Sequence, residues 1–218
     1  MPFDGFTKEA LGFYQDLRDN DWDLNHYNSI KPIYHQQIKP VMEEMLDDLA
    51  FQLQSKIKIM HPDSKRLGEP YPRKVSPTAW GAITKLGAKK GKQLFIAMRP
   101  QTIRIGLYIP QKNEREGPVE DFKKMISKIY NQPEEFLRLL DEAKQHGLVL
   151  CRSPETKDLA LDVVELDLDA EKPHLAIHSH GHFDLVVSYP ISMGAKPALA
   201  EEASRIFEAL VPMWEYLS

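Results

Sequence analysis

The sequence predicts an α+β fold, because helical patterns and β-strand patterns occur in separate runs instead of alternating regularly. Apolar residues recur at helical spacing near both ends and in the middle of the chain, whereas three short β-prone runs follow one another between residues 78 and 109. At 218 residues the chain is long enough for one compact domain with a hydrophobic core, so we expect residues 1–218 to form a single domain.

The first part of the chain predicts two helices. Thr7 is a good N-cap for a short helix that ends near residue 18. A longer helix is expected over residues 29–54, where four apolar residues keep the i, i+4 spacing of one face: Val41, Met45, Leu49 and Leu53. Pro40 removes a backbone donor, so it is expected to kink this helix or split it in two.

The next part predicts antiparallel strands. Residues 61–77 are rich in proline, which indicates an extended surface loop and excludes a helix. Residues 78–86, 94–98 and 103–109 are expected to form three consecutive strands. The lysine-rich turn over residues 87–92 is interpreted as a hairpin tip, because its glycines are too close together for a phosphate-binding P-loop.

The second half of the chain returns to helices and then to strands. Gly117-Pro118 and Gln132-Pro133 each start a predicted helix. Residues 163–169 and 174–189 alternate as strands, and residues 197–217 are expected to form a C-terminal helix.

Composition excludes several classes of protein. Hydrophobic residues make up 42% and charged residues 28%, which argues against disorder. No apolar run approaches the ~18 residues that cross a bilayer, and the start of the chain lacks a signal-peptide pattern, so we expect a cytoplasmic protein without a membrane partner. The lone cysteine, Cys151, cannot form an internal disulfide and is expected to be buried and structural.

Charge is distributed unevenly along the chain. Residues 1–54 have 4 basic and 10 acidic groups, residues 55–104 have 12 and 2, and residues 105–218 have 12 and 20, giving net charges of −6, +10 and −8. The basic segment therefore predicts an anionic partner, either a phosphate-bearing ligand or a nucleic acid. The candidate anion-binding residues are Arg73, Lys74, Lys89, Lys90, Lys92, Arg99 and Arg104, and Tyr71, Trp80 and Phe95 lie among them. The alternative is that these charges are solvated or compensated within the fold, as the overall pI near 6.1 favours.

Histidines cluster near residue 180. In the stretch HLAIHSHGHFD, four histidines and Asp184 occupy even positions, so one strand would place them all on one face. A hairpin with residues 179–181 at its tip is favoured, because a 16-residue strand would be long, and it would place His178 opposite His182. Pairing with the preceding strand would bring Glu165 near His178. Imidazole and carboxylate groups suit a divalent transition metal, so His178, His182, Glu165 and Asp184 are candidate metal ligands; the alternative is an ordinary solvated sheet face.

Three stretches resemble the YktB-like proteins, a bacterial family of uncharacterised function, and a related family of domains of unknown function. They are GFTKEAL at residues 5–11, RKVSPTAWGAITKLGAKKGKQLFI at 73–96 and IFEALVPMWEYL at 206–217. The resemblance implies a single α+β domain with helices packed on a mostly antiparallel sheet. It implies no reaction.

Three functional hypotheses follow. The first is a binding or interaction module that holds an anionic partner through residues 56–104. The second is a metal-dependent hydrolase that uses the histidine and carboxylate groups of residues 163–189. The third is a structural or regulatory protein with neither site. The sequence leaves open whether the protein is an enzyme.

Overall fold

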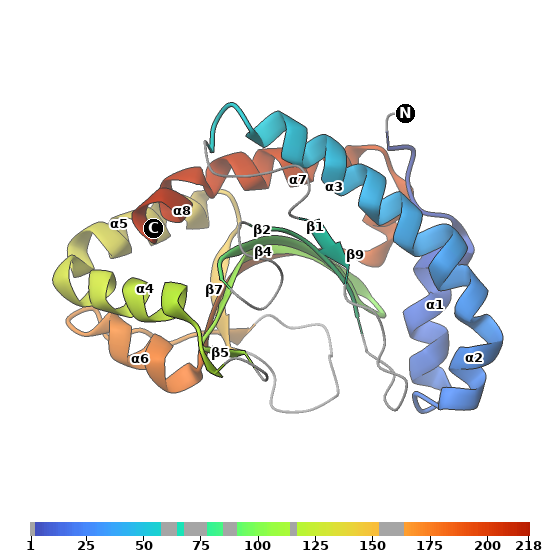
Figure 1. Ribbon diagram of the computed structural model, residues 1–218, viewed down its shortest axis with the longest axis horizontal. Helices are drawn as coiled ribbons and strands as arrows, with labels where there is room; N and C mark the ends of the chain where they lie inside the picture. Colours follow the sequence, from blue (N-terminus) through green and yellow to red (C-terminus); the bar gives the residue numbers. More distant parts are fainter. Residues whose placement is uncertain (1–2, 58–64, 68–77, 85–90, 114–116, 153–163) are drawn as a thin grey trace.

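A curved sheet forms the centre of the molecule (Figure 1). The structure is a computed structural model that describes residues 3–57, 65–67, 78–84, 91–113, 117–152 and 164–218. The strands of the sheet, in spatial order, are β1 Lys65–Leu67, β2 Ala79–Thr84, β3 Gln93–Met98, β4 Thr102–Pro110, β9 His182–Pro190, β7 Val149–Arg152 and β8 Val164–Glu165. A separate two-stranded ribbon consists of β5 Lys112–Asn113 and β6 Gly117–Pro118. Helices accompany this antiparallel sheet, which confirms the α+β class.

The three consecutive strands predicted between residues 78 and 109 are confirmed as β2, β3 and β4, which pair in antiparallel register. β4 then pairs along its whole length with β9, a strand that follows it by more than 70 residues in the chain. This pairing places Arg104 opposite Ser188 and Tyr108 opposite Asp184. Residues distant in sequence therefore meet at the middle of the sheet.

Capping side chains mark the starts of the N-terminal helices, and a proline lies next to the point where the second one is interrupted. α1 (Lys8–Asp19) is capped by Thr7, whose hydroxyl accepts a hydrogen bond from the backbone N–H of Ala10, as predicted. The expected second helix begins earlier, at Leu24, because Asp23 caps it. The interruption expected from Pro40, a kink or a split, is confirmed: α2 (Leu24–Ile33) passes through a π-helical turn, Tyr34–Ile38, into α3 (Lys39–Leu53). The wide turn forms next to a proline that has no N–H to give an α-helical bond.

The remaining helices follow the predicted order with one difference. α4 (Glu120–Asn131) and α5 (Pro133–Gln145) are confirmed. The helical tail expected over residues 197–217 is confirmed, but it is divided into α7 (Ala198–Ala209) and α8 (Val211–Tyr216), which follow a 3₁₀ turn over Ile191–Ala195. Pro212 lies in the first turn of α8, where its missing N–H costs no helical hydrogen bond.

The histidine-rich stretch does not form the expected hairpin. Pro173–His180 is a helix, α6, and the strand β9 starts only at His182. Pro173 starts the helix, and Gly181 ends it in the left-handed region at φ 86°. This pair of residues is typical of the two ends of a helix. Of residues 164–169, the part of the preceding expected strand that the structure describes, only Val164–Glu165 pair, and they pair with β7. The expected pairing that would bring Glu165 near His178 is therefore wrong as well.

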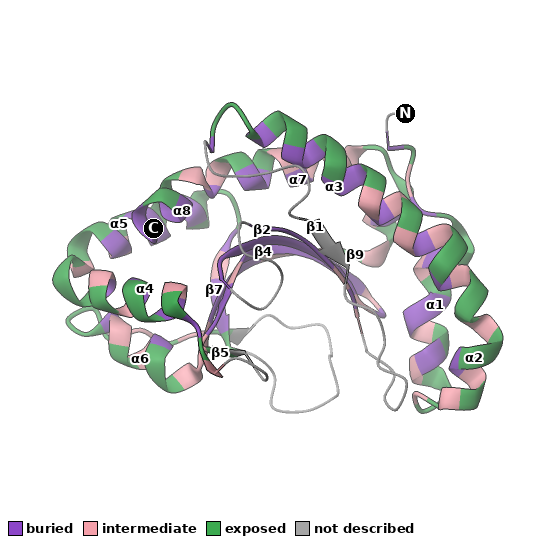
Figure 2. Cartoon of the chain, in the orientation of Figure 1, coloured by how far each residue is buried: buried purple, intermediate pink, exposed green. Residues whose placement is uncertain are grey.

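The sheet has two different faces. In Figure 1 the helices follow its convex side, where α3 packs over β2, α7 over β4 and α5 over β7. One hydrophobic core extends through this layer from Phe3 to Leu217. The inner, concave face carries a second, smaller cluster: Ala82, Phe95, Ala97, Cys151 and Val186, with Trp80 and Tyr108 against it. Most strand residues are buried, whereas the helices alternate buried and exposed positions (Figure 2). Within the described ranges, no helix has both the length and the apolar character needed to cross a membrane.

Candidate anion-binding site

Polar and charged side chains gather on the inner face of the sheet. Successive side chains of a strand point to opposite faces, so the even-numbered residues of β4 and β9 share this face with Val186. Arg104 and Tyr108 come from β4, and Ser188 and Asp184 lie opposite them on β9. Arg99, at the tight turn between β3 and β4, carries a third charge that acts on Arg104 and Asp184.

Several of these groups are buried without a hydrogen-bond partner. Arg104 is 2% exposed and Asp184 is 7% exposed. In the described part of the chain, the buried side-chain atoms that lack a partner include Nε and Nη1 of Arg99, Nε of Arg104, Oδ1 of Asp184 and Oγ of Ser188. Buried polar groups in native proteins are nearly always paired, so a concentration of unpaired ones on one face marks a site.

The charge balance of this face favours an anion. The pKa of Arg99 is lowered to about 10, mainly by burial and secondly by the positive charge of Arg104. Burial also raises the pKa of Asp184 above its ordinary value, against the opposing effects of a hydrogen bond from Cys151 and the two guanidiniums. Among the residues that the structure describes, two cations thus act on one carboxylate, Asp184, whose ionised form is disfavoured. A phosphate or carboxylate group could accept hydrogen bonds from both arginines.

An aromatic cluster adjoins the charged groups. The rings of Trp80 and Phe95 stack with centroids 4.0 Å apart, and Tyr108 meets Trp80 edge-to-face at 5.3 Å. The indole N–H of Trp80 donates to Oε1 of Gln93 at 3.2 Å. Tyr108 also lies 5.7 Å from the ring of His182. These rings provide apolar surroundings, in which an ionic hydrogen bond is stronger than it is in water.

The structure brings together two of the residues predicted to bind anions. Arg99 and Arg104 both face the inner side of the sheet. Lys92 is elsewhere: its Nζ atom donates to the carbonyl of Trp214 at 2.9 Å and lies 4.7 Å from that ring, which ties β3 to the C-terminus. The other predicted residues, Arg73, Lys74, Lys89 and Lys90, lie outside the described residues.

The four predicted metal ligands are spread over different parts of the fold. His178 lines a groove between α4 and α6, and Glu165 pairs with Lys144 at 2.9 Å. His182 and Asp184 do share the inner face of the sheet, as strand alternation predicted. Among the residues that the structure describes, no group of three or more His, Cys, Asp or Glu side chains is placed to hold a metal ion.

Sequence reasoning missed Ser188, Tyr108 and the role of Cys151 in this site. Cys151 is buried, as predicted, but its thiol donates to Oδ2 of Asp184 at 3.3 Å. The available signal was the alternation of side chains within β4 and β9. The polar side chains lie at even-numbered positions, on the same face of the sheet as Gly106 and Val186. Comparison of the chain with protein-family models found no match, and comparison with curated proteins found none either.

Proposed function

We propose that this protein binds a phosphate-bearing small molecule on the inner face of its sheet, with Arg99 and Arg104 as the anion-binding residues. The observation that carries the proposal is the set of buried guanidinium N–H groups without hydrogen-bond partners: Nε and Nη1 of Arg99 and Nε of Arg104. Leaving such donors unpaired costs roughly 1–3 kcal/mol each, and a bound oxyanion would remove that cost.

Burial favours a small ligand over a nucleic acid. Arg104 is 2% exposed, whereas residues that track a nucleic-acid backbone lie along an open, basic groove. Ser188 adds a buried hydroxyl without a partner beside Arg104. The aromatic cluster around Trp80 provides an apolar neighbour for the organic part of such a ligand.

The test is thermal unfolding at low ionic strength with inorganic phosphate, pyrophosphate and nucleoside monophosphates, because a ligand that binds only the folded state raises Tm. We expect at least one of these phosphates to raise Tm of the wild-type protein and the shift to disappear in Arg99→Gln and Arg104→Gln. The matched control is Arg138→Gln, an exposed arginine on α5 that pairs with Glu135 and Glu142, and it should keep the shift.

Two results would overturn the proposal. One is a wild-type protein whose Tm no phosphate raises at low salt. The other is a shift that persists in both inner-face variants. Tighter binding of a short single-stranded oligonucleotide than of any mononucleotide would instead assign the site to a nucleic acid and remove the small-molecule proposal.

A further inference from the structure

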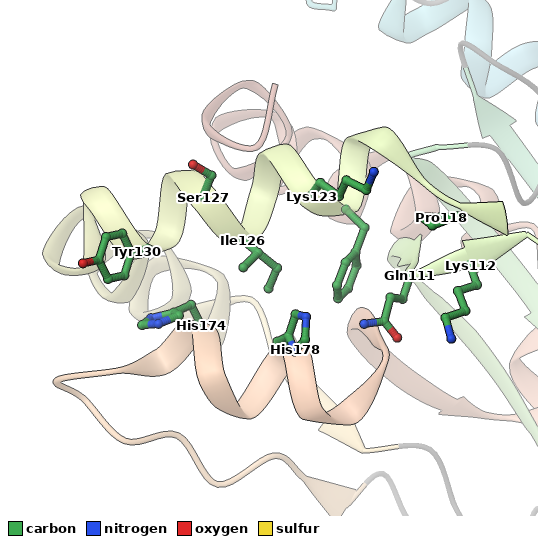
Figure 3. A pocket seen from close by; sticks show the side chains of 10 residues that line it. Gln111, Lys112, Pro118, Lys123, Ile126, Ser127, Tyr130, His174 and His178 are labelled. Atoms are coloured by element: carbon green, nitrogen blue, oxygen red, sulfur yellow. The ribbon is translucent and has the colours of Figure 1, made fainter.

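A groove lies between α4 and α6, on the flank of the molecule and apart from the inner-face site (Figures 1 and 3). Its volume is about 450 Å³, within the range of small-molecule binding sites. None of the residues proposed to bind phosphate lines it. The groove is therefore a second, independent candidate site.

An apolar stripe runs along the α4 side of the groove. Phe122, Ile126 and Tyr130 keep the i, i+4 spacing, so they form one stripe along the helix. Phe122 is buried, but Tyr130 is 66% exposed and meets His174 of α6 edge-to-face at 5.0 Å. Leu175, on α6, is also strongly exposed. This helix pair thus leaves large apolar side chains uncovered, and such patches commonly bind a ligand or partner.

One end of the groove is basic. Figure 3 shows Lys112, from β5, and Lys123, from α4, at the end opposite Tyr130 and His174. Lys123 lies 4.0 Å from Glu120, an exposed pair that contributes little energy. No Asp or Glu is among the described residues that line the groove. The lining therefore combines a positive end with the apolar stripe of α4, and it adds polar groups from Gln111, Ser127, His174 and His178.

We propose that this groove binds an amphipathic anion of the aliphatic carboxylate class. The carboxylate pairs with Lys112 and Lys123, and the alkyl chain lies over Phe122 and Ile126 towards Tyr130. The rise of a helix makes the span from Lys123 to Tyr130 about 10 Å, which suits a medium-length chain. Charge complementarity selects an anion, and the apolar stripe selects an alkyl chain over a compact polar anion such as phosphate.

The experiment is titration with decanoate, followed by the chemical shifts of the protein and by calorimetry, with decyltrimethylammonium and acetate as comparison ligands. We expect saturable binding of decanoate only. Lys112→Glu/Lys123→Glu should weaken it at least tenfold, because the substitutions replace attraction by repulsion, and Ile126→Gln should weaken it through the apolar stripe. The matched control, Lys8→Glu/Lys196→Glu, makes the same charge change at exposed sites away from the groove and should bind as the wild type does.

Outcomes for the two sites are distinguishable. Arg104→Gln should bind decanoate normally, whatever its effect on phosphate. The groove proposal is overturned if decanoate does not saturate, if the cationic amphiphile binds equally well, or if Lys112→Glu/Lys123→Glu binds like the control. Because all four substituted lysines are exposed, equal Tm values for the two double variants would establish that a loss of binding is not a loss of fold.

Discussion

The thiol of Cys151 donates a hydrogen bond to Oδ2 of Asp184, with 3.3 Å between sulfur and oxygen. Burial, the charge of Asp184 and this hydrogen bond all raise the pKa of Cys151 far above its ordinary value, so the thiol stays protonated at neutral pH. Only the thiolate reacts with disulfide reagents. We therefore expect the native protein to react with Ellman's reagent very slowly, and the denatured protein to release one equivalent at once.

The variant Asp184→Asn distinguishes the effect of the Asp184 charge on the reactivity of Cys151 from the effect of burial. Asparagine keeps an oxygen that can accept from the thiol but removes the negative charge, so Cys151 should react faster than in the wild type yet still slower than in the denatured chain. Rapid reaction of the native wild-type thiol would contradict the hydrogen-bonded, buried arrangement.

His182 is expected to make the protein sensitive to acid. Its Nε2 atom lies 2.9 Å from Nε2 of His180, and burial, followed by the charge of His180, lowers the pKa of His182 to about 4. The unfolded state binds a proton at about pH 6.5 and the folded state does so only near pH 4. Stability is therefore fully present above about pH 6.5 and is lost as pH falls towards 4, by at most ~1.4 kcal/mol per pH unit.

His182→Gln should remove that part of the acid sensitivity. Chemical denaturation between pH 7 and 4 measures it as the difference in unfolding free energy between variant and wild type. Asp184 acts in the opposite direction, because its raised pKa favours the folded state at lower pH, but it is present in both proteins and cancels in the difference. A difference that does not change with pH would contradict the assignment to His182.

Local sequence patterns predict the strands of the sheet correctly, but they do not predict the structure of the histidine-rich segment. Strands β2 to β4 are short, β-prone and separated by turn residues, so both their existence and their order follow from sequence. The spacing of His174 and His178 fits a helical face as well as one side of a strand. The flanking Pro173 and Gly181 are the helix start and stop signals that decide between them.

The anion site could be predicted only in part. Arg99 and Arg104 are visible as members of a basic segment, but Asp184 and Ser188 join them through the pairing of β4 with β9, which no local pattern specifies. The charge of a residue also does not show whether it faces the inner side of the sheet, as Arg104 does, or bonds to the C-terminal helix, as Lys92 does. Contacts between residues distant in sequence determine the positions of both side chains.

Removing the surplus cation on the inner face should stabilise the protein. Within the described ranges, two guanidiniums share one carboxylate there, and burial and repulsion by Arg104 lower the pKa of Arg99. Replacing an imperfectly compensated buried ion by an apolar side chain is often stabilising by ~1–4 kcal/mol. Arg99→Met should therefore raise Tm in phosphate-free buffer, whereas Arg138→Met, at an exposed ion pair, should change it little. A lower Tm for Arg99→Met would show that the cation is fully compensated in the free protein.

Lys92 is expected to contribute to stability and not to phosphate binding. Its ammonium group donates to the carbonyl of Trp214 and to the hydroxyl of Ser218, and it lies over the indole ring of Trp214. Lys92→Met should lower the free energy of unfolding by roughly 1–3 kcal/mol, the cost of leaving a buried acceptor without its partner. Denaturant titration measures that loss, and the phosphate-induced change in Tm should stay as in the wild type. Loss of the phosphate response in this variant would join Lys92 to the inner-face site.

Gly106 is expected to tolerate no side chain. It lies on β4 opposite Val186, and a Cβ atom built there would be 2.2 Å from the carbonyl oxygen of Leu185 and 2.9 Å from Cα of Val186. Both contacts are to backbone, so Gly106→Ala must push β9 away from β4 and should cost roughly 1–3 kcal/mol. Gly12, in the exposed part of α1, has nothing within 4 Å of such an atom, and Gly12→Ala should stabilise the protein by about 0.5–1 kcal/mol through helix propensity. Denaturant unfolding of the two variants under one set of conditions should therefore give changes of opposite sign, and a neutral Gly106→Ala would contradict the close approach of these strands.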